Sequence, residues 1–398
     1  MNSPQTPRRA LMSAYSPAPI CAARGEGCYL WDEDGTRYLD FLAGVAVNAL
    51  GHCHPALVET LTRQAGQLWH SSNLLQTAGQ ERLAERLCAA SFAEGVFFTN
   101  SGGEAVDFAL KLVRRVQNMG SSPGRWRTIT FVDGFHGRTM ADIAAGGQAK
   151  LQKGYEPIMS GFDCVPFADI EAVRRATGPE TAAVLLELVQ GDGGIRSFPR
   201  DFVTELRVHC DAHGLLLVLD EVQTGVGRTG KLFAHEHYGI TPDIMACAKG
   251  LGAGFPLGAV LATAEVAATV TPGSHGSTLG GNPLAAAVGN TVLDILLAEG
   301  FLGQVEKTAA ELRGRLEDVA ARYPTVIAEV RGLGLLLGLR CADAVTNTDL
   351  LAALRRQRMI AGPAGHNVVR VLPPLVIDAS HIDEACTALD AACAELSA

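Results

Sequence analysis

The sequence predicts an α/β protein in which a large, mostly parallel β-sheet is followed by a smaller α+β domain. Hydrophobic residues make up 47 % of the 398 residues, which is ample to bury a core and excludes a disordered chain. From about residue 55 to 285, helical patterns alternate with short apolar runs, an order typical of layered α/β domains. Beyond about residue 285 the helical patterns are interrupted by only a few strands, which indicates a second, smaller domain.

Short apolar runs bounded by turn residues mark the strands of the large sheet. They are residues 96–98, 128–132, 183–189, 215–219 and 244–248. The last three are short and almost wholly apolar, as expected for strands buried on both faces of a parallel sheet. Apolar residues at helical spacing predict helices at 81–90 and 104–116.

The two ends of the chain have their own patterns. Asp34-Gly35 separates two strand-like runs, which predicts a hairpin near the N-terminus. The C-terminal part is expected to hold helices at 285–297, 302–323, 348–358 and from Ser380, with a strand pair near 326–339 and a strand at 367–372. We therefore divide the chain into an N-terminal segment (1–54) that packs with the small domain, a large domain (55–284) and a small domain (285–398).

Charge and composition restrict the class of protein. The formal net charge is −9, which argues against nucleic acid or an anionic membrane as the main partner. No run of 18 apolar residues occurs, and Met1 to Arg9 is polar, so we expect neither a membrane span nor a signal peptide. Ten cysteines without a C-x-x-C motif suit reduced thiols. We expect a cytoplasmic enzyme that acts on small molecules.

Two charged residues follow strands that are expected to be buried. Lys249 comes directly after 244–248, and Asp220 ends the run 215–219. A desolvated lysine amine is suited to forming an imine, and a carboxylate at the carboxyl edge of a sheet can pair with a protonated pyridine nitrogen. Taken singly, Lys249 is better explained as a lysine that reaches solvent, whereas Asp220 fits equally an acid that caps the next loop.

Two loops that follow predicted strands have the residues of a binding site. Asn100-Ser101-Gly102-Gly103 precedes a helix, so its backbone N–H groups and the Ser101 hydroxyl could hold an anion. Ser101 and Glu104 also fit a capping box. Phe135 and Arg138 offer an aromatic plane for a heterocycle and a guanidinium for a carboxylate, although a solvated loop would look the same.

Two further patterns suggest other functions. Gly225 to Gly230 matches G-x-G-x-x-G, which would indicate an NAD-dependent dehydrogenase. Four residues separate it from the preceding strand, however, and no clear helix pattern follows. The histidine pairs 52/54, 209/213 and 235/237 lack the spacing of a structural zinc site, so no metal is predicted.

The motifs become specific when their order and spacing are taken together. The segments 100–105 (NSGGEA), 134–139 (GFHGRT), 220–225 (DEVQTG), 248–250 (AKG) and 275–283 (HGSTLGGNP) resemble those of the class III pyridoxal-phosphate aminotransferases. The resemblance runs from Tyr15 to Pro374 and covers nearly the whole chain. It implies the fold-type-I architecture and a homodimer with composite active sites.

The resemblance also implies pyridoxal 5′-phosphate as the cofactor, with Lys249 and Asp220 as the catalytic residues. Lys249 would form the imine with the cofactor and shuttle the proton, and Asp220 would keep the pyridine nitrogen protonated. The other cofactor-binding positions that it implies are Ser101, Gly102 and Gly103 at the phosphate, Phe135 on the ring face, His136, Gln223 near the phenolic oxygen, and Thr278 from the partner subunit. With Lys249, Asp220 and Gln223 all present, a catalytically idle relative is disfavoured.

Within this family, the chain is most similar to the branch that acts on N2-acetylornithine. The implied reaction moves the δ-amino group of N2-acetylornithine to 2-oxoglutarate, giving N-acetylglutamate 5-semialdehyde and glutamate in arginine biosynthesis. Val45 favours an acylated ornithine over ornithine. Succinylornithine, succinyl-diaminopimelate, ornithine and 4-aminobutyrate are the alternative donors. The implied substrate-binding residues are Tyr15, Arg138, Glu187, Asp192, Ser277 and Arg370.

The chain departs from the family pattern at 187–194. Relatives usually read Glu-Pro-Ile-Gln-Gly-Glu-Gly-Gly, whereas this chain reads Glu-Leu-Val-Gln-Gly-Asp-Gly-Gly. Asp192 is one methylene shorter than the usual acid, so we expect its pair with Arg370 to be longer or bridged by water. The sequence leaves open whether Glu187 or Asp192 pairs with Arg370. Gly103 also replaces a more common Thr or Ala.

Overall fold

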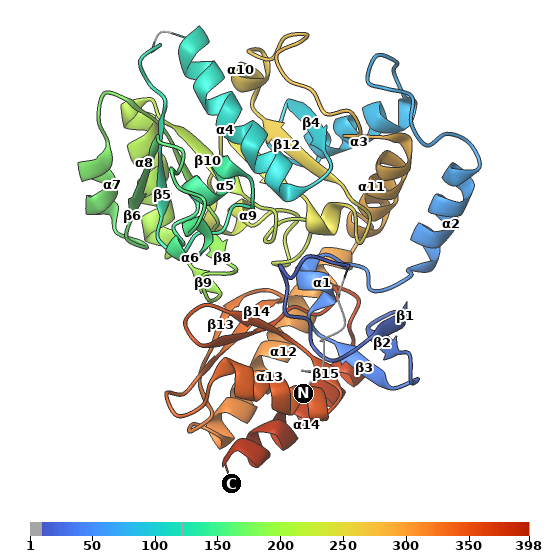
Figure 1. Cartoon of the computed structure of the whole chain (residues 1–398). Coiled ribbons are helices and arrows are strands. Elements are labelled where there is room, and N and C mark those ends of the chain that lie inside the picture. Colours follow the sequence, from blue (N-terminus) through green and yellow to red (C-terminus); the bar gives the residue numbers. More distant parts are fainter. Residues whose placement is uncertain (1–9, 121, 398) are drawn as a thin grey trace, which may run out of the picture.

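The computed structural model describes residues 10–120 and 122–397, so the expectation for Met1 to Arg9 lies outside the described residues. Figure 1 shows a larger lobe above a smaller one, with the first strands of the chain beside the smaller lobe. Among the described residues, no single helix has the length and apolar character to cross a membrane. One pair of helices bent by 72°, Pro283–Leu296 with Phe301–Arg322, meets the same criteria by length and composition only.

The larger lobe is built on a mixed sheet. Within the described residues its order is β4 (Gly95–Thr99), β12 (Gly258–Ala262), β11 (Ile244–Cys247), β10 (Leu216–Asp220), β7 (Thr181–Leu186), β5 (Arg127–Phe131) and β6 (Phe162–Val165). β12 alone runs in the direction opposite to the other six strands. The predicted fold class, a large and mostly parallel sheet with a smaller α+β part, is confirmed.

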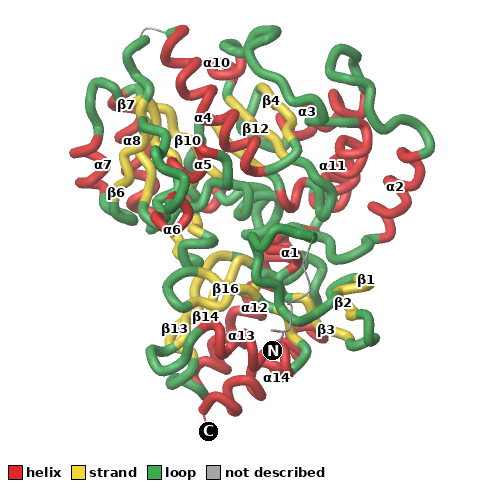
Figure 2. The backbone as a smooth tube through the Cα atoms, in the orientation of Figure 1, coloured by secondary structure: helices red, strands yellow, loops and turns green. Residues whose placement is uncertain are grey.

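Helices cover both faces of this sheet, as Figure 2 shows. Val218 of β10 packs in one hydrophobic cluster with α4 (Gly102–Met119), whereas Leu217 and Leu219 pack in another with α8 (Arg200–His213). Successive side chains of a strand point to opposite faces, so a strand between two helical layers must be apolar throughout. This explains the apolar run that predicted β10.

One strand prediction in the large sheet needs correction, and two of its strands, β6 and β12, were not predicted. The strand predicted at 183–189 ends at Leu186, because the Glu187 side chain turns back to accept hydrogen bonds from backbone N–H groups. β12 follows a loop rich in Gly and Pro, and its antiparallel direction requires no crossover helix, so no alternation of strand and helix marks it.

The remaining helices are α1 (Ala43–Ala46), α2 (Pro55–Ala65), α3 (Ala78–Ala89), α5 (Met140–Ala145), α6 (Ala149–Gln152), α7 (Ile170–Ala176), α9 (His235–Tyr238), the 3-10 turn η1 (Lys249–Leu251), α10 (Ala264–Ala267), α11 (Pro283–Leu296), α12 (Phe301–Arg322), α13 (Asn347–Arg356) and α14 (Ala379–Ser397). Five of them were predicted, with boundaries that differ by a few residues, namely α3, α11, α12, α13 and α14. The others, together with α8, were not predicted.

The smaller lobe contains two four-stranded sheets among the described residues. One has the order β13 (Ile327–Leu333), β14 (Leu336–Cys341), β17 (Val368–Val371) and β16 (Gly362–Ala364). The other has the order β1 (Ala22–Glu26), β2 (Tyr29–Asp32), β3 (Arg37–Asp40) and β15 (Met359–Ile360). The predicted hairpin is confirmed as β2–β3, with Gly35 in the left-handed region at φ +81°. A short hairpin, β8 (Val189–Gln190) with β9 (Arg196–Ser197), lies between the lobes.

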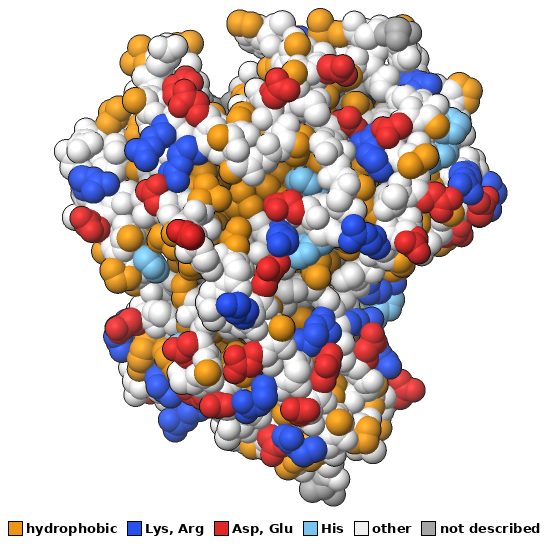
Figure 3. Space-filling model, turned by 180° about the vertical axis from the view of Figure 1, so that it is seen from behind, with side chains coloured by type: hydrophobic (Ala, Val, Ile, Leu, Met, Phe, Trp, Pro, Cys, Tyr) orange, Lys and Arg blue, Asp and Glu red, His pale blue; other side chains and the backbone are white. Residues whose placement is uncertain are grey.

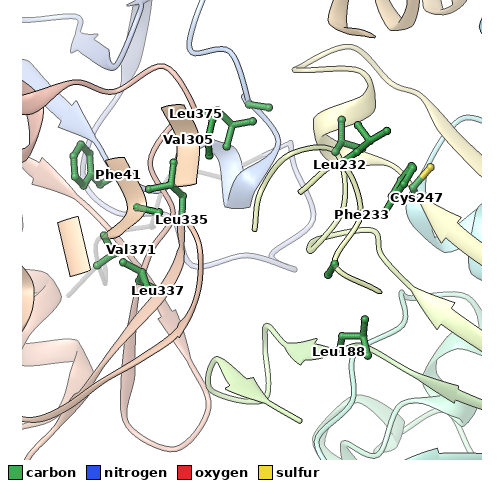
Figure 4. Close-up of a cluster of buried hydrophobic side chains, with 14 of the residues drawn as sticks. Phe41, Leu188, Leu232, Phe233, Cys247, Val305, Leu335, Leu337, Val371 and Leu375 are labelled. Atoms are coloured by element: carbon green, nitrogen blue, oxygen red, sulfur yellow. The ribbon is translucent and has the colours of Figure 1, made fainter. Parts of the chain in front are cut away.

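Hydrophobic packing is continuous between the two lobes. Figure 4 shows Leu337 of β14 and Val371 of β17 on one side, and Phe233 and Cys247 of the larger lobe on the other. All of them belong to a single cluster of buried side chains. The two sheets are therefore joined by a shared core, and the carboxyl edge of the large sheet faces the small lobe.

Candidate active site

The carboxyl ends of the large sheet open into a cavity of about 360 Å³. The loops that follow β4, β5, β10 and β11 all contribute to its wall, because parallel strands end at the same edge. Predicted residues that line it are Ser101, Gly102, Gly103, Phe135, His136, Glu187, Asp192, Asp220, Gln223 and Lys249. Ser101 and Lys249, which are 148 positions apart in the sequence, thus share one cavity.

Lys249 begins η1, separated from the end of β11 by one residue, and its side chain lines the cavity. Its φ of +38° is uncommon for a residue with a side chain and marks a strained backbone at the cavity. Burial, followed by the charge of Arg370, lowers the pKa of the Lys249 amine to about 8. The amine is therefore far more nucleophilic near neutral pH than an exposed lysine.

The lowered pKa can be tested on the protein without its cofactor. Half of the Lys249 amine should be neutral at about pH 8 instead of at the ordinary value of 10.5, so its acylation should rise and level off near that pH. Peptide mass spectrometry after brief treatment with an amine-selective reagent measures this. The exposed Lys307 serves as the internal comparison. A Lys249 profile that still climbs steeply above pH 10 would contradict the lowered pKa.

Asp220 lies at the floor of the cavity and is almost wholly buried. The His136 imidazole donates from Nδ1 to Asp220 Oδ2 at 2.8 Å, and the backbone N–H of Val222 donates to Oδ1 at 3.0 Å. Burial opposes a charge on His136, but the hydrogen bond and charge of Asp220 raise the pKa of His136 overall. Asp220 is therefore held rigidly by a donor on each oxygen.

The loop between β4 and α4 has the expected form of an anion site. Ser101 is the N-cap of α4, and its hydroxyl accepts a hydrogen bond from Glu104 N at 3.3 Å. The capping box is only half formed, because the Glu104 carboxylate accepts from Asn100 N and Nδ2 at 2.9 Å and not from Ser101 N. A Cβ on Gly102, the first residue of α4, would lie 2.6 Å from the Val222 side chain, so only glycine fits at this position.

Gln223 and Phe135 present a polar and an aromatic group to the same cavity. The Gln223 Oε1 atom is buried and has no hydrogen-bond partner among the described residues. A Cβ on Gly191 would lie 2.0 Å from that oxygen, so glycine at 191 leaves the amide its room. An unsatisfied buried oxygen is costly, and it points to a missing donor in the cavity.

The two acids that the sequence left open have separate partners. Asp192 Oδ1 lies 2.5 Å from Arg370 Nη1, so Asp192 forms the pair. Glu187 instead accepts from Phe135 N at 2.9 Å and from Gly191 N at 3.1 Å. Burial, and then the charge of Asp220, raise the pKa of Glu187 to about 7.

The expectation of a long or water-bridged pair is wrong. Gly365 N, in the turn between β16 and β17, donates to the Asp192 carbonyl at 2.8 Å. This bond draws the loop after β8 toward the strand that carries Arg370, which compensates for the shorter side chain.

Five predicted residues do not line this cavity in a single chain. One of them, Arg370, lies behind it and is paired with Asp192, which does line it. Tyr15, Arg138 and Thr278 are exposed, with Arg138 5.4 Å from the Phe135 ring centroid. Ser277 accepts a hydrogen bond from Asn100 Nδ2 at 3.1 Å and thereby reaches the edge of the anion loop. Val45, which was expected to influence the donor, lies within α1 with a non-helical φ of +64°, and Val47 two residues later lines the cavity instead.

The sequence interpretation missed Val222 and Phe255, which also line the cavity. Val222 could have been found, because it follows Asp220 by two residues and therefore lies at the same sheet edge. No sequence pattern predicted Phe255, because it lies in the irregular part of the connection between β11 and β12, and the path of that loop brings it to the cavity.

The Gly225 to Gly230 motif is a packed loop. A Cβ on Gly227 would lie 2.9 Å from Leu375, and Arg228 is buried with its guanidinium donating to the carbonyls of Leu335 and Pro373. Neither a helix N-terminus nor the cavity adjoins it, so a dinucleotide phosphate has no access there.

The geometry defines a lysine–aspartate site at the carboxyl edge of a mixed α/β sheet, and comparison with known proteins agrees with it. The aminotransferase class-III family model matches residues 11–393, and the chain belongs to this family. Acetylornithine aminotransferase of Brucella melitensis is 55 % identical over 97 % of this chain and 96 % of its own length.

Solved structures show the same fold. N-acetylornithine aminotransferase from Stenotrophomonas maltophilia has a TM-score of 0.84 and 37 % identity over 96 % of this chain and 97 % of its own. Ornithine aminotransferase from Toxoplasma gondii has a TM-score of 0.93 and 30 % identity over 98 % of this chain and 93 % of its own. The protein is thus a class-III aminotransferase, and pyridoxal 5′-phosphate is its cofactor.

Proposed function

We propose that this enzyme transfers the δ-amino group of N2-acetylornithine to 2-oxoglutarate, in arginine biosynthesis. The observation that carries the transamination is the convergence of Lys249, Asp220 and the Ser101–Gly103 loop on one cavity. The choice of donor rests on the 55 % identity to a relative named acetylornithine aminotransferase.

The residues of the cavity fit the cofactor. The buried Gln223 Oε1 lacks a partner, the glycines at 102 and 103 open the backbone of the loop, and Phe135 offers a flat apolar wall. When bound, pyridoxal phosphate supplies an aldehyde that captures the amine and a ring that delocalises the electron pair released at the reacting carbon. Ser101, Gly102 and Gly103 would hold its phosphate at the N-terminus of α4.

Lys249 and Asp220 would perform the chemical steps. Neutral Lys249 Nζ would take the proton from the carbon that carries the reacting amine and deliver it to the carbon of the cofactor's aldehyde group. Asp220, fixed by His136 and Val222 N, keeps a proton on the ring nitrogen through its negative charge. Phe135 and Val222 would enclose the ring, while Gln223 would face its phenolic oxygen.

Arg370 would bind a carboxylate of 2-oxoglutarate. Its guanidinium is paired with Asp192, which lines the cavity, and its Nε has no partner among the described residues. A carboxylate of a dicarboxylate can take the place of Asp192 on this guanidinium, while N2-acetylornithine, which has only methylenes next to its reacting amine, leaves the pair intact. The pocket would thereby accept two different substrates. Tyr15, Arg138, Glu187 and Ser277 remain proposed contacts of the substrate.

Arg370→Ala is expected to raise the KM for 2-oxoglutarate by about 10- to 100-fold, the usual effect of losing a hydrogen bond to a charged group. Steady-state kinetics with varied 2-oxoglutarate measure this. Arg340→Ala is the matched control, because Arg340 lies on the neighbouring strand β14 and pairs with Glu329 away from the cavity. An unchanged KM in the Arg370 variant would exclude this arginine from carboxylate binding.

We also propose a cytoplasmic homodimer in which Thr278 of one subunit completes the phosphate site of the other. Thr278 is exposed and lies outside the cavity of its own chain. Large apolar side chains are exposed on the nearby segments, namely Leu68, Trp69, Leu74, Leu75 and Leu279. Figure 3 shows hydrophobic side chains gathered in the middle of the larger lobe, while charged ones dominate the smaller lobe.

The function is tested by the absorbance spectrum of the purified enzyme before and after N2-acetylornithine is added without a keto acid. We expect a yellow band that bleaches with the donor and returns with 2-oxoglutarate. Succinylornithine, succinyl-diaminopimelate, ornithine and 4-aminobutyrate are run in parallel. A band that only one of these bleaches would reassign the donor, whereas no band after pyridoxal phosphate is supplied would contradict the central role of Lys249.

A further inference from the structure

A buried carboxyl group lies directly behind the proposed phosphate loop. Asp142 is on α5, which follows the Phe135–Arg138 loop, and is fully buried. A Cβ on Gly103 would lie 2.9 Å from Asp142 Oδ2, and one on Gly137 only 2.1 Å from it. Gly103 and Gly137 both line the cavity. The carboxyl group therefore fills the space between two loops. The opposite side of each loop faces the cavity in which pyridoxal phosphate is proposed to bind.

The two oxygens of Asp142 have different surroundings. Oδ2 accepts a hydrogen bond from Thr139 N at 3.1 Å, while Thr139 Oγ1 accepts from Asp142 N at 3.1 Å in a capping box. Oδ1 is buried and has no partner among the described residues. A proton on Oδ1 leaves the Thr139 bond intact, so ionisation changes the charge behind the loop while the capping box persists.

The surroundings allow this carboxyl group to titrate near neutral pH. Burial, opposed by the hydrogen bonds from Thr139, raises the pKa of Asp142 to about 7. Asp107 of α4 raises this pKa and His136 lowers it. The other titratable side chains on the elements next to α5 are Glu104, Lys111, Arg114 and Arg115 of α4, Arg138 of the preceding loop, Lys150 of α6, and Asp163 and Cys164 of β6.

We propose that Asp142 is a positioning residue for the cofactor phosphate, which holds Gly103 against Gly137 and weakens phosphate binding when it loses its proton. The inference rests on the proposed phosphate site at Ser101–Gly103. A negative charge behind a loop that binds a dianion opposes that dianion, and the low dielectric of the interior strengthens the effect. Affinity for pyridoxal phosphate should then fall as the pH rises through neutrality, by about tenfold for each unit that the phosphate raises the pKa of Asp142.

The test measures the dissociation constant of pyridoxal phosphate from the cofactor-free enzyme between pH 6 and 8.5, for wild type and Asp142→Asn. Asparagine keeps an oxygen for Thr139 N and carries no charge. We expect the ratio of wild-type to variant dissociation constants to rise about tenfold over this range. Pyridoxal, which lacks the phosphate, is the matched ligand, and for it the ratio should stay constant.

A constant ratio for pyridoxal phosphate, or an equal rise with pyridoxal, would overturn the role of Asp142. If Asp142→Asn does not fold, Asp142→Thr offers another neutral acceptor. Wild type alone also decides the matter, because its preference for pyridoxal phosphate over pyridoxal should decline above pH 7. Failure of wild type to bind pyridoxal phosphate at any pH would overturn the proposed phosphate site together with this role, whereas binding with a flat ratio overturns this role alone.

Discussion

Lys249→Ala is expected to abolish turnover while the protein remains folded. The variant lacks the only lysine that lines the cavity among the described residues, and with it the amine that holds the cofactor and moves the proton. We expect kcat to fall by at least about a thousandfold, since nucleophile and base are lost together. Alanine removes a buried amine and introduces no new polar group, so the fold should persist.

Steady-state transamination, circular dichroism and gel filtration measure this outcome. Lys307→Ala is the control, because Lys307 is exposed on α12. The yellow band should be absent from Lys249→Ala and present in the control. Transamination by Lys249→Ala at more than a few per cent of the wild-type rate would show that another amine does this chemistry.

Asp220→Ala is expected to bind the cofactor and lose about 10²- to 10⁴-fold in kcat, because the ring nitrogen is no longer held in its protonated form. Alanine also leaves the buried His136 without its acceptor, which costs stability. Asp220→Asn separates the two effects. Asparagine can accept the His136 hydrogen bond but carries no charge, so it should restore stability and leave kcat low.

Steady-state transamination measures kcat, stopped-flow half-reactions measure the rate constant of the chemical step, and thermal unfolding measures the midpoint temperature. Asp163→Ala is a suitable control, since it removes a carboxylate that pairs with Arg127 at the far edge of the same sheet. Near-wild-type kcat in both Asp220 variants would remove the proposed role of its charge.

The sequence predicted the residues whose position depends on a strand end. Lys249, Asp220 and Ser101 each follow a short apolar run, and parallel strands bring such residues to one edge whatever the loops do. The His136–Asp220 bond joins residues 84 positions apart and depends on how two loops lie over that edge. No periodicity encodes it, so no partner for His136 was predicted.

Contacts made by irregular loops were harder to anticipate. The direct Asp192–Arg370 pair depends on the bond between Gly365 N and the Asp192 carbonyl, which links two turns from different lobes. Side-chain length alone suggested a longer pair. Tyr15 and Thr278 are exposed in a single chain and lie outside the cavity.

The reversed strand β12 has a consequence for motion. Lys249 lies in the connection between β11 and β12, which are hydrogen-bonded neighbours, so both ends of this loop are fixed in the middle of the sheet. The loop can shift only if two central strands separate. Its backbone amides at the strand ends should exchange with deuterium as slowly as those of the sheet, while the loops after β5 and β8 exchange faster. The Lys249 amine is thus held by a connection that is anchored in the sheet at both ends. We expect the loops around it to move when the enzyme binds its two different substrates.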